Sequence, residues 1–183
     1  MMRHAPIFAI LSMLVGASSG CGGAVPAASF EEARNSADLA AELKALREIV
    51  PDQAHVMADV GDHFTNLWFA GEAENWPLAD FYLSETKSHL RWAVRVKPIR
   101  KDNGGREINL PGILEAFENT QLAQLKKAVD GHDRGAFRAV YRDSLTACYG
   151  CHKASDKPYL RPRVPGSPAS NIINFDPKAE WPR

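Results

Sequence analysis

Residues 125–161 read LKKAVDGHDRGAFRAVYRDSLTACYGCHKASDKPYLR. Within this run a helical pattern of apolar residues ends in Cys148, Cys151 and His152, at the spacing C-x-x-C-H. Cysteines at this spacing occur in three kinds of site: a redox-active dithiol, half of a zinc site, and the attachment point of a covalent haem. Features elsewhere in the sequence are needed to decide among these three kinds of site.

The N-terminal segment has the build of a secretory signal peptide. Residues 1–27 read MMRHAPIFAILSMLVGASSGCGGAVPA, with a basic start at Arg3, an apolar run over residues 7–17 and small residues after it. The run is shorter than the roughly 20 apolar residues that a membrane-spanning helix needs. We therefore expect an exported protein, in the periplasm or beyond.

The sequence at the end of this signal peptide allows two interpretations of how it is processed. Residues 18–21, Ser-Ser-Gly-Cys, resemble a bacterial lipobox, in which the cysteine becomes the lipid-carrying first residue, although lipoboxes usually have leucine where this chain has Ser18. Ordinary cleavage near Ala27 is the other reading. A lipid anchor at Cys21 is the one membrane contact that we expect.

Composition limits the function classes. The chain has 22 basic and 22 acidic side chains, so nothing in it predicts nucleic-acid binding. Its length after the signal suits one domain with a core of its own.

Apolar periodicity predicts an all-α chain. Expected helices cover residues 36–50, 51–73 and 78–96, followed by a fourth from Pro111 and a fifth that ends in the C-x-x-C-H. The polar segment 97–109 reads as a loop, and no convincing strand is present. We expect a four-helix bundle with an additional N-terminal helix over residues 36–155, and an extended, proline-rich tail over residues 156–183.

The dithiol and zinc readings fit this context poorly. A thioredoxin-like dithiol starts a helix that follows a strand, whereas this motif ends a helical pattern. Structural zinc takes four ligands, and the motif supplies three with no second cysteine pair downstream. The remaining histidines of the folded region are single and scattered: His55, His63, His89 and His132.

Covalent haem fits the spacing better. On a helix Cys148 and Cys151 lie one turn apart, roughly 5–6 Å from each other, so both can reach the vinyl groups along one edge of a porphyrin. His152, at i+4 from Cys148, falls on the same face and can offer a ring nitrogen to iron. Attachment takes place outside the cytoplasmic membrane, which agrees with export. We expect one covalent haem c.

The run 125–161 resembles the final helices of cytochrome c-prime, the four-helix-bundle class II of c-type cytochromes. Residues 62–67, Asp-His-Phe-Thr-Asn-Leu, resemble the histidine-phenylalanine segment in the first bundle helix of that family. This register implies that Met57 faces the distal side of the haem. Residues 63–83 depart from the family pattern and are similar to a set of uncharacterised exported bacterial proteins that resemble c-type cytochromes.

Two side chains are candidates for the sixth iron ligand. Met57 is the first, because a thioether opposite histidine raises the reduction potential, although a methionine on an apolar stripe also packs well. His63 is the alternative, either as a ligand or as a hydrogen-bonded core histidine. The two are on different faces of one helix, and a vacant sixth position is the third reading.

These patterns predict a monohaem cytochrome that transfers single electrons between redox partner proteins, and no enzymatic activity. A five-coordinate haem module that binds nitric oxide or carbon monoxide, and a helical lipoprotein without haem, are the alternatives. Basic residues that follow the motif would lie near the haem propionates or form a docking surface: Lys153, Lys157, Arg161 and Arg163. The helix over residues 36–50 is a candidate surface for a homodimer.

Overall fold

The computed structural model describes the backbone of residues 27–180 and the side chains of residues 35–180. Cys21 and residues 1–26 of the expected signal peptide lie outside these described residues. The chain is mostly helical, as predicted. Among the described residues, no helix combines the length and apolar character needed to cross a membrane.

Helix α1 (Ala27–Ile49) belongs to a compact unit separate from the one that begins at Val50. It contains most of the segment for which a helix was expected. Its leucines Leu39, Leu43 and Leu46 are each about half exposed. The second unit, which begins at Val50, contains both strands and all the other helices of the described residues.

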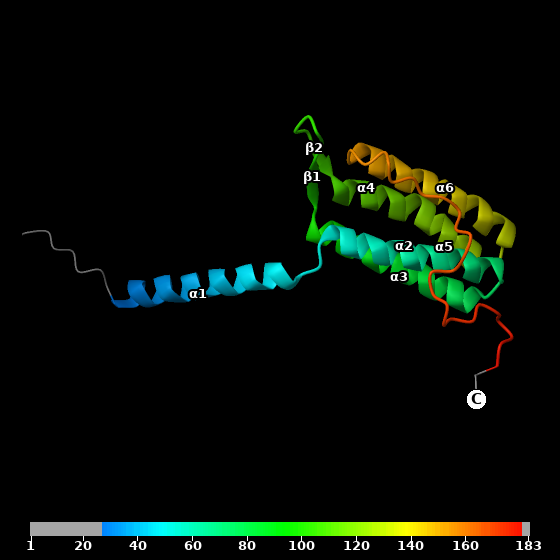
Figure 1. Cartoon of the computed structure of the whole chain (residues 1–183), viewed down its shortest axis with the longest axis horizontal. Coiled ribbons are helices and arrows are strands. Elements are labelled where there is room, and N and C mark those ends of the chain that lie inside the picture. The colour runs from blue at the N-terminus through cyan, green and yellow to red at the C-terminus, as the bar shows by residue number, and fades with distance from the viewer. Residues whose placement is uncertain (1–26, 181–183) are drawn as a thin grey trace, which may run out of the picture. The chain divides into compact units, whose positions relative to one another are not determined.

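Helices α2 (Gln53–Glu72) and α3 (Trp76–Val96) form a helical hairpin (Figure 1). Asp52 caps α2 by accepting a hydrogen bond from the backbone N–H of His55 at 2.9 Å, and Asn75 caps α3 by accepting from Leu78 at 3.3 Å. Both helices were predicted within a few residues, because capping residues and prolines mark their ends.

The prediction of no strand is wrong for the segment that follows α3. Strands β1 (Ile99–Lys101) and β2 (Glu107–Asn109) pair antiparallel, with Arg100 opposite Ile108. The turn is held by Asp102, whose carboxylate accepts hydrogen bonds from Arg106. Three-residue strands with one buried side chain give no alternating pattern, so the sequence showed only a polar loop.

The expected fourth helix is three segments in one rod: α4 (Leu110–Phe117), a π-helical turn η1 (Glu118–Leu122) and α5 (Ala123–Asp130). Because a π-helical turn contains more residues than an α-helical turn, the apolar side chains before and after it face in different directions. Before it, apolar side chains such as Ile113 and Phe117 line a cavity; after it, Leu125 and Val129 enter the core.

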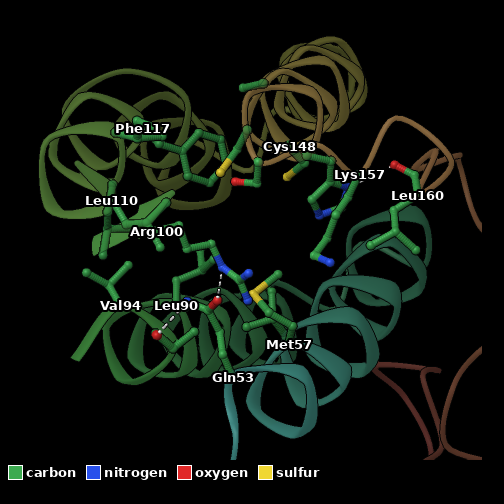
Figure 2. A pocket seen from close by; sticks show the side chains of 18 of the residues that line it. Gln53, Met57, Leu90, Val94, Arg100, Leu110, Phe117, Cys148, Lys157 and Leu160 are labelled. Atoms are coloured by element: carbon green, nitrogen blue, oxygen red, sulfur yellow. Dashed lines mark hydrogen bonds between the residues drawn. The ribbon is translucent and has the colours of Figure 1, made fainter. Parts of the chain in front are cut away.

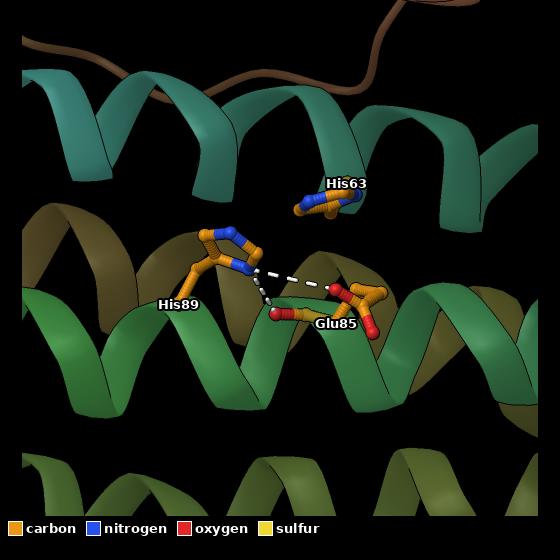
Figure 3. Close-up of side chains that lie close together, drawn as sticks. All are labelled: His63, Glu85 and His89. Atoms are coloured by element: carbon orange, nitrogen blue, oxygen red, sulfur yellow. Dashed lines mark hydrogen bonds and ion pairs between the residues drawn. The ribbon is translucent and has the colours of Figure 1, made fainter.

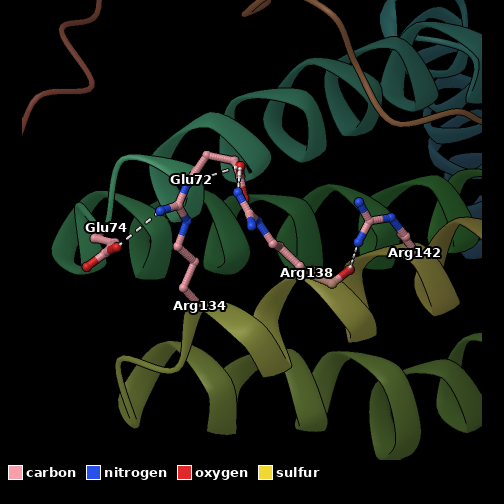
Figure 4. Close-up of polar contacts among 5 residues, drawn as sticks. All are labelled: Glu72, Glu74, Arg134, Arg138 and Arg142. Carbon is pink, nitrogen blue, oxygen red and sulfur yellow. Dashed lines mark hydrogen bonds and ion pairs between the residues drawn. The ribbon is translucent and has the colours of Figure 1, made fainter.

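Helix α6 (Arg134–Ala154) carries the C-x-x-C-H in its last turns, as predicted, and packs against α5 and α2. Asp133 caps it by accepting from the N–H of Ala136 at 2.9 Å. Near its start Arg138 donates two hydrogen bonds to Glu72, at 2.6 and 2.5 Å, and Arg134 approaches the same carboxylate at 3.4 Å (Figure 4). These ion pairs join the end of α2 to the start of α6.

An aromatic core fixes α6 against α2. The rings of Phe64 and Tyr141 stack with centroids 4.3 Å apart, and Trp68 lies 4.8 Å from Tyr141. The Tyr141 hydroxyl donates to the Phe64 carbonyl oxygen at 2.9 Å. This satisfies a buried polar group that would otherwise destabilise the core.

The tail that follows Ala154 has no regular secondary structure and runs back across the helices (Figure 1). The Asn66 side chain accepts hydrogen bonds from the backbone of Ala169 and Ser170, at 3.0 and 3.3 Å. Phe175 packs against the core beside Phe69. The tail is therefore part of the folded unit.

Candidate functional site

A cavity of about 360 Å³ lies in the second unit, among α2, α3, α4 and α6 (Figure 2). Its size is within the range of roughly 300–1,000 Å³ that is usual for ligand sites. Most of the lining is aliphatic or aromatic, and the apolar walls are formed by Val60, Leu90, Val94, Leu110, Ile113, Leu114 and Phe117. The sequence-predicted residues Cys148, Cys151, His152 and Met57 all line this one cavity.

Both cysteine side chains are free thiols at the cavity wall. Burial raises the pKa of Cys148 from 9.0 to about 12, and the neighbouring Cys151 adds to the effect. Burial also raises the pKa of Cys151, partly offset by a hydrogen bond with Ser155 and by the charge of Arg100. A redox dithiol needs a lowered thiol pKa, so this environment argues against that chemistry.

The motif does not have the geometry of a zinc site either. Zinc ligands lie about 2.0–2.3 Å from the metal, so their donor atoms must converge. Among residues 35–180, one group of three histidine, cysteine or carboxylate donors converges to within 4.8 Å, and it consists of His63, Glu85 and His89. The C-x-x-C-H residues are not part of it.

His152 is held in one orientation by the tail. Its Nδ1 atom lies 2.9 Å from the carbonyl oxygen of Leu160. Because a carbonyl can only accept, Nδ1 carries a proton, and in the neutral ring the lone pair is therefore on Nε2. Metal-binding histidines are commonly oriented by this kind of bond.

Met57 reaches the cavity from α2, on the side opposite Cys148 (Figure 2). His63 stands six positions further along the same helix and is not among the cavity-lining residues of the described chain. It lies instead beside His89 of α3, with ring centroids 4.6 Å apart. The structure thus brings Met57, but not His63, together with the motif.

Two cationic side chains line the cavity, Arg100 from β1 and Lys157 from the tail. Arg100 donates to the side-chain oxygen of Gln53 at 2.6 Å. Of the four basic residues singled out in the sequence, Lys157 is the one among the described lining residues, while Lys153 lies over the ring of Tyr149. Arg100 was missed because its strand was missed.

No protein-family model, curated protein or solved structure matches this chain. A functional assignment therefore depends on the motif and on the cavity that contains it.

Proposed function

We propose that this chain is a monohaem c-type cytochrome that transfers single electrons. The observation that carries the proposal is the cavity itself: the C-x-x-C-H of α6 and Met57 of α2 line the same apolar space. Cys148 and Cys151 would hold the haem by thioether bonds, with His152 as proximal ligand and Met57 as the sixth. When bound, the haem supplies a one-electron iron(III)/iron(II) couple.

The donor set suits this group. The hydrogen bond from His152 Nδ1 to the Leu160 carbonyl oxygen would orient the ring and favour the tautomer whose lone pair is on Nε2. Most of the cavity lining is apolar, and a thioether ligand from Met57 would raise the reduction potential of the bound haem. Arg100 and Lys157 supply positive charge for carboxylates such as the propionates.

The proposed architecture is a four-helix bundle of the cytochrome c-prime class. Its support is the mutual packing of α2, α3, the α4–α5 rod and α6, with the motif near the end of the last helix. Helix α1 would be an addition to that bundle. Proposed partners are redox proteins outside the cytoplasmic membrane, and Cys21 is the proposed lipid anchor if the signal is of the lipoprotein type.

An absorption spectrum tests the proposal. The chain is expressed with the haem-attachment machinery, and spectra are taken oxidised, reduced, and reduced with carbon monoxide. We expect a Soret band that survives denaturation, because the group is covalent, and sharp reduced bands that carbon monoxide does not move. The double variant Cys148→Ser/Cys151→Ser should lose the band, while the exposed control Thr146→Ala should keep it. Wild-type protein without Soret absorption would establish a helical protein without haem.

A gas-binding module is the second candidate. It is favoured by the apolar character of the cavity wall around Met57, with Val60 and Leu90 nearby in the lining. If Met57 fills space in the cavity and does not coordinate iron, the sixth coordination position of the proposed haem iron would be open to nitric oxide or carbon monoxide. Broad reduced bands that shift with carbon monoxide would select this function over electron transfer.

A further inference from the structure

A second cluster of metal-ligating side chains lies between α2 and α3 (Figure 3). It consists of His63 on α2 and of Glu85 and His89, one turn apart on α3. One donor atom from each residue lies within 4.8 Å of those of the other two. None of the three is among the described residues that line the cavity.

We propose that His63, Glu85 and His89 bind one divalent transition-metal ion of the zinc type, with water in the fourth position. Two imidazoles and one carboxylate are a donor set that Zn²⁺ accepts with an open coordination position. The site is independent of the proposed haem, since it shares no residue with the motif or the cavity.

An unpartnered atom supports the site. The Nδ1 atom of His63 is buried and has no hydrogen-bond partner among the described residues. Buried polar side-chain atoms are nearly always paired, so an atom without a partner requires an explanation. A metal ion bound between the two helices would be the partner that this Nδ1 atom lacks among the described residues.

The two residues on α3 are held close to each other. The Nδ1 atom of His89 lies 2.9 Å from the backbone carbonyl oxygen of Glu85, so Nδ1 carries a proton, and in the neutral ring the lone pair is on Nε2. The Glu85 carboxylate is 3.8 Å from the same Nδ1, too far for a hydrogen bond, and remains available. Side-chain exposures of 35% for Glu85 and 19% for His89 leave a path for an ion from solvent.

Electrostatics at the cluster favour a cation. Asp59 and Asp62 are close enough to act on His63 together with Glu85. Tetrahedral zinc with bonds near 2.0–2.1 Å needs donors about 3.3 Å apart, so donors that now lie within 4.8 Å would have to approach one another on binding.

The test is calorimetric titration of tag-free, metal-stripped protein with zinc chloride. It is performed on the Cys148→Ser/Cys151→Ser chain, so that motif thiols cannot bind the metal, and repeated on the wild-type chain. We expect one ion per chain and a rise in the unfolding temperature with zinc, because a ligand of the folded state stabilises it.

Matched variants locate the site. Glu85→Gln keeps size and shape but removes the charge, and His89→Gln removes an imidazole; each should weaken binding at least about tenfold. His55→Ala, an exposed histidine of the same helix as His63, should bind as before. Circular dichroism confirms that each variant is folded. Equal affinity in Glu85→Gln, His89→Gln and their parent, or no binding by the parent, would overturn the proposal.

Discussion

The Nδ1 atom of His152 lies 2.9 Å from the carbonyl oxygen of Leu160, which belongs to the tail and not to a helix. The proposed iron ligand is therefore oriented by a segment that follows it in the chain. The same tail is anchored through Asn66 and Phe175 to the other end of the unit. Loss of the tail's anchors should consequently affect both stability and the site.

Replacing Phe175 by alanine tests the anchor. Its ring packs beside Phe69 and Tyr82, with centroids 6.0 and 6.4 Å away. We expect a loss of about 2 kcal/mol in the free energy of unfolding, somewhat less than for a fully buried phenylalanine. Urea denaturation measures it. Ile172→Ala is the control, since Ile172 is 87% exposed, and an equal loss in both variants would contradict the packing role.

Met57→Ala distinguishes electron transfer from gas binding. If the thioether is the sixth ligand, the variant should change from low to high spin and acquire carbon monoxide binding, which absorption spectra detect. His63→Gln should leave the spectrum unchanged, because His63 is not among the described residues that line the cavity. A spectral change in the His63 variant with none in Met57→Ala would reverse the ligand assignment.

Two glycines of α2 should respond to alanine with opposite signs. A Cβ at Gly71 would overlap the ring of the fully buried Phe137, whereas a Cβ at Gly61 has no heavy atom within 4 Å. Gly61→Ala should therefore stabilise by up to about 1 kcal/mol through helix propensity. Gly71→Ala should destabilise by about 1–3 kcal/mol through overpacking. Stabilisation by both changes, in thermal or urea unfolding, would show that α6 does not lie against Gly71.

The ion pair of Glu72 predicts a pH dependence. Hydrogen bonds from Arg138, then the charges of Arg138 and Arg134, hold the pKa of Glu72 below its ordinary value of 4.5. A depressed pKa stabilises the fold above the unfolded-state pKa, and the contribution is lost as pH falls through the folded-state value.

Glu72→Gln should therefore cost about 1 kcal/mol at pH 7, and the difference from wild type should shrink as the pH falls below 4.5. Glu74→Gln is the control, because Glu74 is 56% exposed and its ion pair with Arg134 is long, at 3.4 Å. Urea unfolding at a series of pH values measures both. A difference that stays constant down to acid pH would exclude the ion pair as its origin.

The sequence predicted well what short-range chemistry determines. Helices α2, α3 and α6 are marked by Asp52, Asn75 and Asp133, whose side chains cap them. The C-x-x-C-H motif could also be recognised without knowledge of the tertiary structure. Met57 was singled out through a resemblance; it lines the same cavity as the motif, and its role as an iron ligand stays a prediction.

Long-range relationships were beyond the sequence. Arg100 reaches the cavity through a hairpin whose strands are too short to show a period. The pairing of His63 with His89 depends on how α2 and α3 are aligned against each other, which helical periodicity does not specify. Neither His89 nor Glu85 could be recognised as a donor without that alignment.

The π turn η1 separates the cavity wall of α4 from the core face of α5. Each residue of an α-helix turns the chain by about 100°, so the loss of one codon within Glu118–Leu122 would rotate α4 relative to α5 by about that angle. The shape of the cavity can in this way be altered by chain length alone, with every core residue of α5 retained. A one-residue deletion of this kind would change which side chains of α4 face the cavity without a substitution at any of them.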